Sequence, residues 1–306
     1  MIPKISIALI TYNGEKYIRE QLDSILSQTI QNFEIVVCDD CSTDFTRFIL
    51  TEYAQKDARV VLNFNEKNLG FLRNIEKAIK LCKGEFIALA DQDDIWEIEH
   101  LFVLHSNIGD NFLICGDTLF VDEKGNSLDF RLSQAFTIDI NSLRNNDEHL
   151  LRLLVMDNIF QGAAMMINRK IIDMALPFPE GIKYHDIWLA LCAMALNKFA
   201  YIPSVIIRYR RHSANCALGW ECYPTDCSFI PKMEYMMPLK SLPLSESSKL
   251  IIKSAENFFL NRNKLYKKHK AIFFWVRNYR ILYATDNKKR FLRRFYRVFL
   301  KYRNLK

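Results

Sequence analysis

The chain has 306 residues, half of them hydrophobic and a quarter charged, which is ordinary for a globular protein with a sizeable core. It contains no run of 18 apolar residues, so its composition argues against a membrane-spanning protein. The formal net charge of +7 hides an asymmetry. From Arg262 to the C-terminus there are 16 Lys or Arg residues and one acid, Asp286, so this tail carries +15 and the remainder −8.

Strand and helix patterns alternate along the first 90 residues. Apolar runs predict strands at 5–10, 33–38, 60–64 and 86–90. Helical apolar spacing with turn residues at its ends predicts helices at 17–27, 45–55 and 71–81. This rhythm predicts an α/β fold with a parallel sheet and right-handed crossovers. A G-x-G-x-x-G fingerprint is absent, which argues against dinucleotide binding.

Cysteine usage and the N-terminus favour a cytosolic protein. Met1 to Lys4 leads directly into a strand pattern, and the eight cysteines are spread through the chain, so we expect reduced thiols. Cys38 and Cys41 fit C-x-x-C, but a zinc site would need a second pair, and the acids between them would raise a thiol pKa. We expect neither a redox nor a metal role for this pair.

Carboxylates follow two of the predicted strands. Asp91, Asp93 and Asp94 come directly after 86–90, and Asp39 and Asp40 follow 33–38. Neighbouring negative charges repel each other and raise their own pKa values, and a bound divalent cation such as Mg²⁺ or Mn²⁺ removes that cost. In open α/β sheets, ligands bind outside the carboxyl ends of the strands. The alternative is a helix cap, which accounts for one aspartate but not for three.

The two acidic strand ends together suggest a ligand. An aspartate can accept from the imide N–H of uracil or thymine, or from ribose hydroxyls, and a cation can hold a diphosphate. If both strand ends lie on one edge of the sheet, we expect a pyrimidine nucleoside diphosphate in the crevice between them.

Four segments carry a resemblance to a known family. They are Ile10-Thr11-Tyr12-Asn13, Val37-Cys38-Asp39-Asp40-Cys41-Ser42-Thr43-Asp44, Asn68-Leu69-Gly70 and Asp91-Gln92-Asp93-Asp94. Together they resemble the family 2 glycosyltransferases of the GT-A fold, although Cys41 stands where the family commonly has glycine. The last segment, followed by Ile95-Trp96, is similar to the rhamnosyltransferase-like branch. The likeness covers residues 3 to 220.

The resemblance implies a fold and a domain division. We expect a GT-A domain at 1–220, with a Rossmann-like, mostly parallel sheet flanked by helices. Residues 221–306 would then form a helical, basic C-terminal region.

The resemblance also implies a donor site. Asp93 would hold Mn²⁺ or Mg²⁺ together with Asp91 and His212, and Asp91 is left open between metal and ribose. His212 lies in Arg210-Arg211-His212-Ser213-Ala214-Asn215, which resembles the family's Tyr-Arg-x-His-x-x-Asn; the alternative is a solvated basic loop. The residues expected to bind the nucleotide sugar are Thr11, Tyr12, Asn13, Asp39, Asn68, Gly70, Asp91 and Arg210.

On the acceptor side, Asp186 opens a helix that we expect to reach about Leu196. By resemblance it is the general base that deprotonates the acceptor hydroxyl; the alternatives are an N-cap without chemistry, or His185 as the base. Gly162, in a segment that resembles the family's acceptor side, and His185 and Trp188 are expected to contact the acceptor. Further strands are expected at 112–117 and 205–209.

The tail has a different character. Helical spacing covers 244–266, the stretch 271–276 is apolar, and 288–300 alternates cations with aromatic residues. Phe291, Leu292, Phe295, Val298 and Phe299 share one helical face, which suits the interface of an anionic membrane. The alternatives are packing on the protein's own body or on a partner. Nucleic acid is a third option, but no known module is visible, so we do not expect it.

These observations lead to one interpretation and one competitor. We expect a metal-dependent, inverting glycosyltransferase that moves a sugar from a UDP- or dTDP-sugar to a glycan or lipid-linked glycan in cell-surface polysaccharide synthesis. It would be cytoplasmic and peripheral on the inner face of the cytoplasmic membrane. The competitor is a non-catalytic nucleotide-sugar or glycan-binding protein on the same scaffold.

Overall fold

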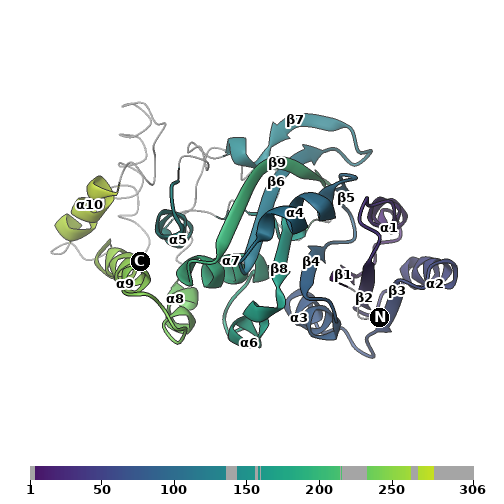
Figure 1. Ribbon diagram of the computed structural model, residues 1–306, viewed down its shortest axis with the longest axis horizontal. Helices are drawn as coiled ribbons and strands as arrows, with labels where there is room; N and C mark the ends of the chain where they lie inside the picture. Colours follow the sequence, from purple (N-terminus) through teal and green to yellow (C-terminus); the bar gives the residue numbers. More distant parts are fainter. Residues whose placement is uncertain are drawn as a thin grey trace. The chain divides into compact units, whose positions relative to one another are not determined.

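The first half of the sheet follows the alternation of strands and helices in the sequence. The structure is a computed structural model in which residues 4–135, 143–155, 158, 160–213, 215, 233–262 and 268–278 are described. The elements are β1 (Ile5–Thr11), α1 (Ile18–Leu26), β2 (Phe33–Asp39), α2 (Thr46–Lys56), β3 (Val60–Phe64), α3 (Phe71–Leu81) and β4 (Phe86–Ala90). The four strands pair in parallel in the order β3-β2-β1-β4 (Figure 1). Every residue of β1, β2 and β4 is buried, as expected for parallel strands covered on both faces.

The second half makes the sheet mixed. It contributes β5 (Ile95–Trp96), α4 (His100–Ile108), β6 (Leu113–Val121), β7 (Ser127–Arg131), β8 (Met165–Asn168) and β9 (Phe199–Arg210). Strand β8 lies between β4 and β6 and is antiparallel to both, whereas β9 runs parallel to β6. Strands β6 and β9 are longer than the predicted 112–117 and 205–209, because the two pair along nearly their whole length. Two short helical turns, Gly162–Ala164 and Arg169–Ile171, flank β8, α6 (Ile172–Ala175) follows them, and α7 (His185–Ala195) precedes β9.

The residues group into two units. The first consists of Met1–Leu132, Phe160–Ala193 and Lys198–Ala217, and the second of Ser133–Ile159, Met194–Asn197 and Leu218–Lys306. The second unit thus includes an internal segment, 133–159, that the sequence analysis placed in the GT-A domain.

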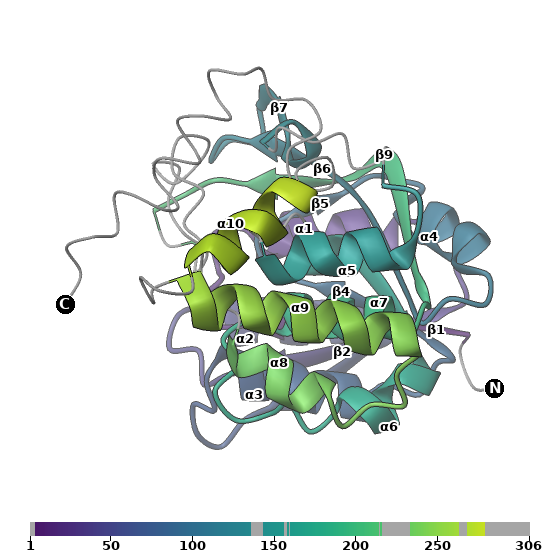
Figure 2. The same ribbon diagram turned by 90° about the vertical axis from the view of Figure 1, so that its left-hand side faces the viewer.

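The second unit is helical where it is described. Its helices are α5 (Asn146–Val155), α8 (Met233–Leu239), α9 (Glu246–Arg262) and α10 (Lys268–Arg277). Figure 2 shows α9 beside α5, α8 and α10, and the ring of Phe258 on α9 lies 5.1 Å from that of Phe274 on α10. Helix α9 falls within the predicted helical stretch 244–266, and α10 contains the predicted apolar stretch 271–276. The amphipathic stretch 288–300 lies outside the described residues. Among the helices that the structure describes, none combines the length and apolarity needed to cross a bilayer.

Candidate active site

The sheet brings the two acidic strand ends to one edge. Strands β2 and β4 flank β1 and run parallel to it, with Thr11 opposite Asp39 and Leu9 opposite Ala90. The loops that follow these three strands therefore leave the sheet at the same edge. The shared edge on which the sequence analysis depended is present.

Asp39, the last residue of β2, is buried at this edge. Its side chain is fully buried, and it accepts hydrogen bonds from Thr11 Oγ1 at 2.9 Å, from Arg47 Nε at 2.6 Å and from the hydroxyl of Ser42. Both carboxylate oxygens are thus engaged by protein groups. Asp39 and Thr11 thus form a buried polar pair at this edge, and the partly exposed Arg47 is ion-paired with Asp39.

Asp40, which the sequence analysis did not assign to a role, anchors the turn at 68–70. Its carboxylate accepts from the backbone N–H groups of Leu69 (2.7 Å) and Gly70 (2.9 Å), and Asn68 donates back to the Asp40 carbonyl at 3.2 Å. Gly70 has φ of +79°, which a glycine adopts without strain. Asn68 and Gly70 are therefore held against the edge of the site by Asp40.

Cys41 has a backbone conformation that glycine adopts more easily than other residues do. Its φ is +66°, in the left-handed region, and its thiol donates to the Asn65 carbonyl at 3.1 Å. The residue thus differs from the family's usual glycine, while the backbone conformation of Cys41 is one that glycine adopts readily. Cys38 and Cys41 are both free thiols, and burial raises the pKa of Cys38 to about 11, which does not suit a redox pair.

The carboxylates after β4 differ from one another. The Asp93 Oδ2 atom lies 2.9 Å from His212 Nε2. Burial, together with repulsion from Asp93 and Asp186, raises the pKa of Asp91 to about 7. Asp94 is fully buried; one oxygen accepts from the Arg210 backbone N–H at 3.2 Å, and the other has no partner among the described residues. Burial, together with repulsion from Asp93 and Asp91, raises the pKa of Asp94 well above its ordinary range.

This donor set suits a divalent cation. Neighbouring ligand atoms of an octahedral ion with bonds of about 2.1 Å lie about 3 Å apart, which matches the 2.9 Å between Asp93 and His212. A cation would also relieve the repulsion that raises the pKa of Asp91. Across the described ranges, however, no three His, Cys, Asp or Glu side chains already form a metal cluster, so a third ligand atom would come from a side-chain movement or from the diphosphate.

Arg210 holds in place the acidic loop, residues 91–94, which follows β4. Its side chain is 1% exposed, and its guanidinium donates to the Asp93 carbonyl (3.0 Å), to the Glu123 carbonyl (2.9 Å) and to the carboxylate of Glu20. The sequence analysis expected Arg210 to bind the nucleotide sugar. With these partners it is placed to position the loop that carries Asp93.

Asp186 lies near the acidic loop, in the first turn of α7. Its charge acts on the carboxyl of Asp91, so the two groups share one electrostatic environment. A carboxylate in the first turn of a helix is favoured by the helix dipole.

The three residues expected to contact the acceptor, His185, Trp188 and Gly162, are buried. His185 is buried against Phe71 with ring centroids 5.2 Å apart, and burial lowers its pKa to about 4, so it is neutral near pH 7. Trp188 is 2% exposed, and its indole N–H donates to the Ala175 carbonyl at 2.9 Å. Gly162 is also buried, and a Cβ there would lie 2.8 Å from His185 Nε2. In this structure the side chains of His185 and Trp188 are buried, and Gly162 lies against His185 and close to the Cβ of Asp186.

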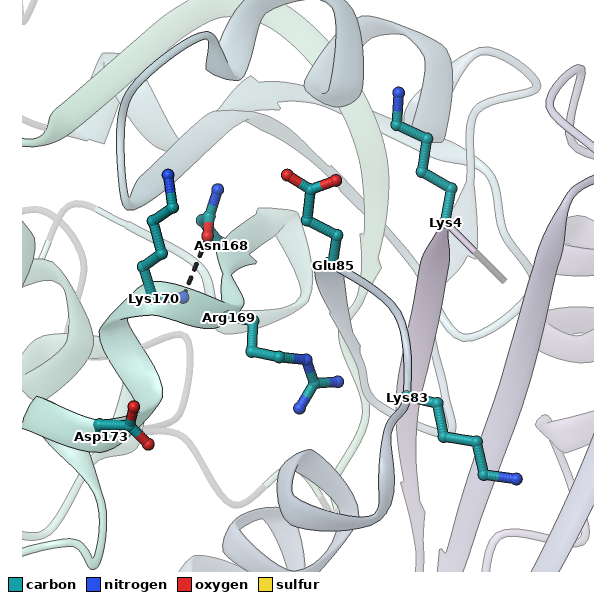
Figure 3. Close-up of a pocket in the computed structure, with 7 residues that line it drawn as sticks. All are labelled: Lys4, Lys83, Glu85, Asn168, Arg169, Lys170 and Asp173. Carbon is teal, nitrogen blue, oxygen red and sulfur yellow. Dashed lines mark hydrogen bonds between the residues drawn. The ribbon is translucent and has the colours of Figure 1, made fainter. Parts of the chain in front are cut away.

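A separate hollow of about 640 Å³ lies at the opposite edge of the sheet. It is lined by Lys4, Lys83, Glu85, Asn168, Arg169, Lys170 and Asp173. Lys4 precedes β1 and Glu85 precedes β4, so the five residues of β4, about 17 Å of strand, separate it from Asp91. Figure 3 shows the ammonium groups of the three lysines spread well apart, and Arg169 donates to the carbonyls of Cys82 and Gly84. The hollow is not part of the candidate active site.

Comparisons with known proteins give relatives of this chain in sequence and in fold. A curated relative, an uncharacterised glycosyltransferase of Methanocaldococcus jannaschii, is 29% identical over 216 residues, which are 68% of this chain and 71% of the relative. The structure of S. aureus TarS 1–349 in complex with UDP-GlcNAc has a TM-score of 0.59 at 20% identity, and the match covers 91% of this chain and 81% of that one. The mannosyltransferase PcManGT of Pyrobaculum calidifontis, in complex with GDP-Man and Mn²⁺, has a TM-score of 0.58 at 17% identity and covers 99% of this chain and 82% of that one.

The structural likenesses establish the fold, which is that of the GT-A glycosyltransferases. Residues 6–174, more than half of the chain, match the family described as Glycosyl transferase family 2. This match spans β1 to β4, the acidic loop and β8. The chain therefore belongs to glycosyl transferase family 2.

Proposed function

We propose that this protein is a metal-dependent, inverting glycosyltransferase that uses a UDP- or dTDP-sugar. The observation that carries the proposal is the gathering of Asp91, Asp93, His212 and Asp186 at the edge where β2, β1 and β4 end. Two structures of the same fold were determined with nucleotide sugars, one of them with Mn²⁺, which supports a donor and a cation of these classes.

On the donor side, Asp93 and His212 would hold the cation, and Asp91 would either join them or contact the ribose. The cation supplies charge stabilisation to the diphosphate when it is bound. Tyr12, Asn13 and the turn at 68–70 would line the nucleoside. Of these, Tyr12 is 50% exposed and offers its ring to a base.

On the acceptor side, Asp186 would take the proton from the attacking hydroxyl. A carboxylate base needs to reach that hydroxyl while it stays ionised, and the first turn of α7 favours the ionised form. His185 is less suited to this task because it is buried and sits beneath Gly162. We propose that it supports Asp186.

We also propose that the second unit contacts an anionic membrane, where a lipid-linked glycan acceptor would be found. On α10, Phe273 is 67% exposed and Val276 is 54% exposed, and the exposed cations Lys270 and Arg277 lie beside them on the helix. The sequence from Arg262 onward carries +15. Apolar side chains flanked by cations suit the interface of an anionic bilayer. We propose that the protein works at the inner face of the cytoplasmic membrane, in the synthesis of a cell-surface polysaccharide.

The deciding experiment tests a panel of UDP-, dTDP- and GDP-sugars with and without Mn²⁺. For each sugar, the thermal shift of the protein and the release of nucleoside diphosphate are both measured. A transferase should be stabilised by its donor and should release the diphosphate, slowly with water and faster with an acceptor. A binding protein on the same scaffold would be stabilised without release. Release that is equal with Mn²⁺ and with a chelator would count against the metal-dependent mechanism.

A further inference from the structure

The side chain of Gln92 binds the backbone of Tyr12 with both ends of its amide. Gln92 Oε1 accepts from the Tyr12 N–H at 2.8 Å, and Gln92 Nε2 donates to the Tyr12 carbonyl at 3.1 Å. The two residues are 80 positions apart in the sequence. They meet because β1 and β4 are neighbours, so the loops that follow the two strands leave the sheet together.

The side-chain amide of Gln92 also lies close to Gly14. A Cβ placed on Gly14 would lie 2.3 Å from Gln92 Oε1 and 2.6 Å from its Cδ, distances that real Cβ atoms do not show. The amide is therefore enclosed between the backbone of Tyr12 and that of Gly14. A carboxamide is also the group this position requires, because it accepts and donates at once, whereas a glutamate would set a carboxylate against the Tyr12 carbonyl.

The two joined loops have different tasks in the proposed site. The loop after β1 holds Tyr12 and Asn13 on the nucleoside side, and Asn13 is tied to Ser42 and Thr43 by two further hydrogen bonds. The loop after β4 holds Asp91 and Asp93, which flank Gln92 in the sequence, on the cation side. A ligand that orders one loop will order the other, provided the link between them is stiff.

We infer that Gln92 is a positioning residue that couples nucleotide binding to cation binding. The inference rests on the proposed function and adds a mechanism by which the two ligands help each other. Coupling between two sites is reciprocal, so it can be measured from either ligand, and values of about 5- to 150-fold are typical. Gln92 itself would touch neither ligand.

The experiment measures the dissociation constant of UDP with and without MnCl₂ in the full-length protein. The variants are Gln92→Ala, Gln92→Glu and the control Gln55→Ala, which removes an exposed glutamine from α2. We expect Mn²⁺ to tighten UDP binding in the wild type and in Gln55→Ala. In the two Gln92 variants we expect at least about fivefold of that tightening to be lost.

A second measurement tests the contact without any ligand. Gly14→Ala should lower the urea midpoint when Gln92 is present, because the new methyl group displaces the amide from Tyr12, and less in the Gly14→Ala/Gln92→Ala double variant, where the clash has no partner. If Gln92→Ala keeps the full effect of Mn²⁺ on UDP binding, or if the two substitutions are additive, the inference is wrong while the proposed function stands. If the wild type binds UDP, dTDP and GDP with no effect of Mn²⁺, the proposed metal-dependent function and the inference both fail.

Discussion

The Nε2 atom of His212 lies 2.9 Å from Oδ2 of Asp93, although 119 positions separate the two residues in the sequence. One stands in the loop after β4 and the other just beyond the end of β9. The ring of Tyr17 packs on the His212 imidazole with centroids 4.7 Å apart, so the orientation of the imidazole is supported from the side. A histidine held in this way next to a carboxylate can, together with that carboxylate, supply two ligands to a cation.

Asp93→Ala should abolish most metal-dependent activity. Stabilisation of diphosphate charge by a cation is worth several kcal/mol, and each 1.4 kcal/mol is about tenfold in rate, so we expect at least about a hundredfold fall in Mn²⁺-dependent diphosphate release. The measurement is nucleoside diphosphate release at saturating Mn²⁺, with Asp110→Ala, an exposed aspartate beyond α4, as the control. Undiminished release by Asp93→Ala would remove Asp93 from the cation site.

Asp186→Asn should separate binding from chemistry. The amide keeps the shape of the side chain and cannot take a proton, so transfer to an acceptor should fall by about 10²- to 10⁴-fold. The thermal shift produced by UDP with Mn²⁺ should be retained. Asp173→Asn, on the exposed side of α6, is the matched control. A normal transfer rate in Asp186→Asn would leave Asp186 with a capping role only.

Cys41 offers a test of backbone strain. A residue with a Cβ at φ of +66° costs about 1–2 kcal/mol relative to glycine, and the thiol hydrogen bond to Asn65 returns part of this. We expect Cys41→Gly to raise the free energy of unfolding by up to about 1 kcal/mol, and Cys41→Val to lower it, because β-branched residues fit this region worst. Urea denaturation measures both. A more stable Cys41→Val would show that the turn is not left-handed in solution.

His100 should make the protein sensitive to acid. Its ring is stacked on Trp96 at 3.8 Å, its Nδ1 bonds the Ile206 carbonyl, and its Nε2 has no partner among the described residues. Burial lowers the pKa of His100 to about 3. Since the unfolded chain binds this proton near pH 6.5, the stability contributed by neutral His100 is fully present above pH 6.5 and is lost as the pH falls toward 3.

The substitution His100→Phe isolates this effect. Between pH 6.5 and pH 4 the free energy of unfolding of the wild type should fall more steeply than that of His100→Phe, by up to about 1.4 kcal/mol per pH unit. His105→Phe, at a less buried histidine of the same helix, should change the slope less. Equal slopes in the wild type and His100→Phe would mean that His100 is protonated or exposed in the folded protein.

The outer side chains of α10 should contribute to membrane binding. Replacing Phe273 and Val276 together by serine removes the exposed apolar area but no charge, so vesicles of phosphatidylglycerol should be bound more weakly at both low and high salt. Lys270→Gln with Arg277→Gln should weaken binding mainly at low salt. Co-sedimentation with anionic and with neutral vesicles measures both. Equal retention of all variants would assign this surface to a protein partner.

Local signals in the sequence were enough for the first half of the sheet. Apolar runs broken by Gly70, Gly84 and the aspartates place β1 to β4 within one or two residues, and the rhythm of strands and helices predicts that these strands run parallel. The antiparallel position of β8 could not be predicted in the same way, because its four residues are identified as a strand only by their pairing with β4 and β6.

The roles of adjacent site residues depended on partners that are distant in the sequence. Asp39 and Asp40 are the same residue type side by side, and only the folded chain shows that Asp39 meets Thr11 and Arg47 while Asp40 meets the turn at 68–70. For Trp188 a signal was available. Every residue from Ile187 to Ala195 is apolar, and a helix that is apolar on all sides is buried.

The absence of a side chain at Gly162 lets the first turn of α7 pack close to this residue. A side chain at this position would meet His185 Nε2 at 2.8 Å and would lie 3.5 Å from the Cβ of Asp186, so even a methyl group would require the His185 ring or the start of the helix to shift. The reach that we propose for the Asp186 carboxylate toward a sugar therefore depends on the absence of a side chain on a different segment. A larger residue at position 162 would act as a spacer that displaces the proposed base without altering any polar group.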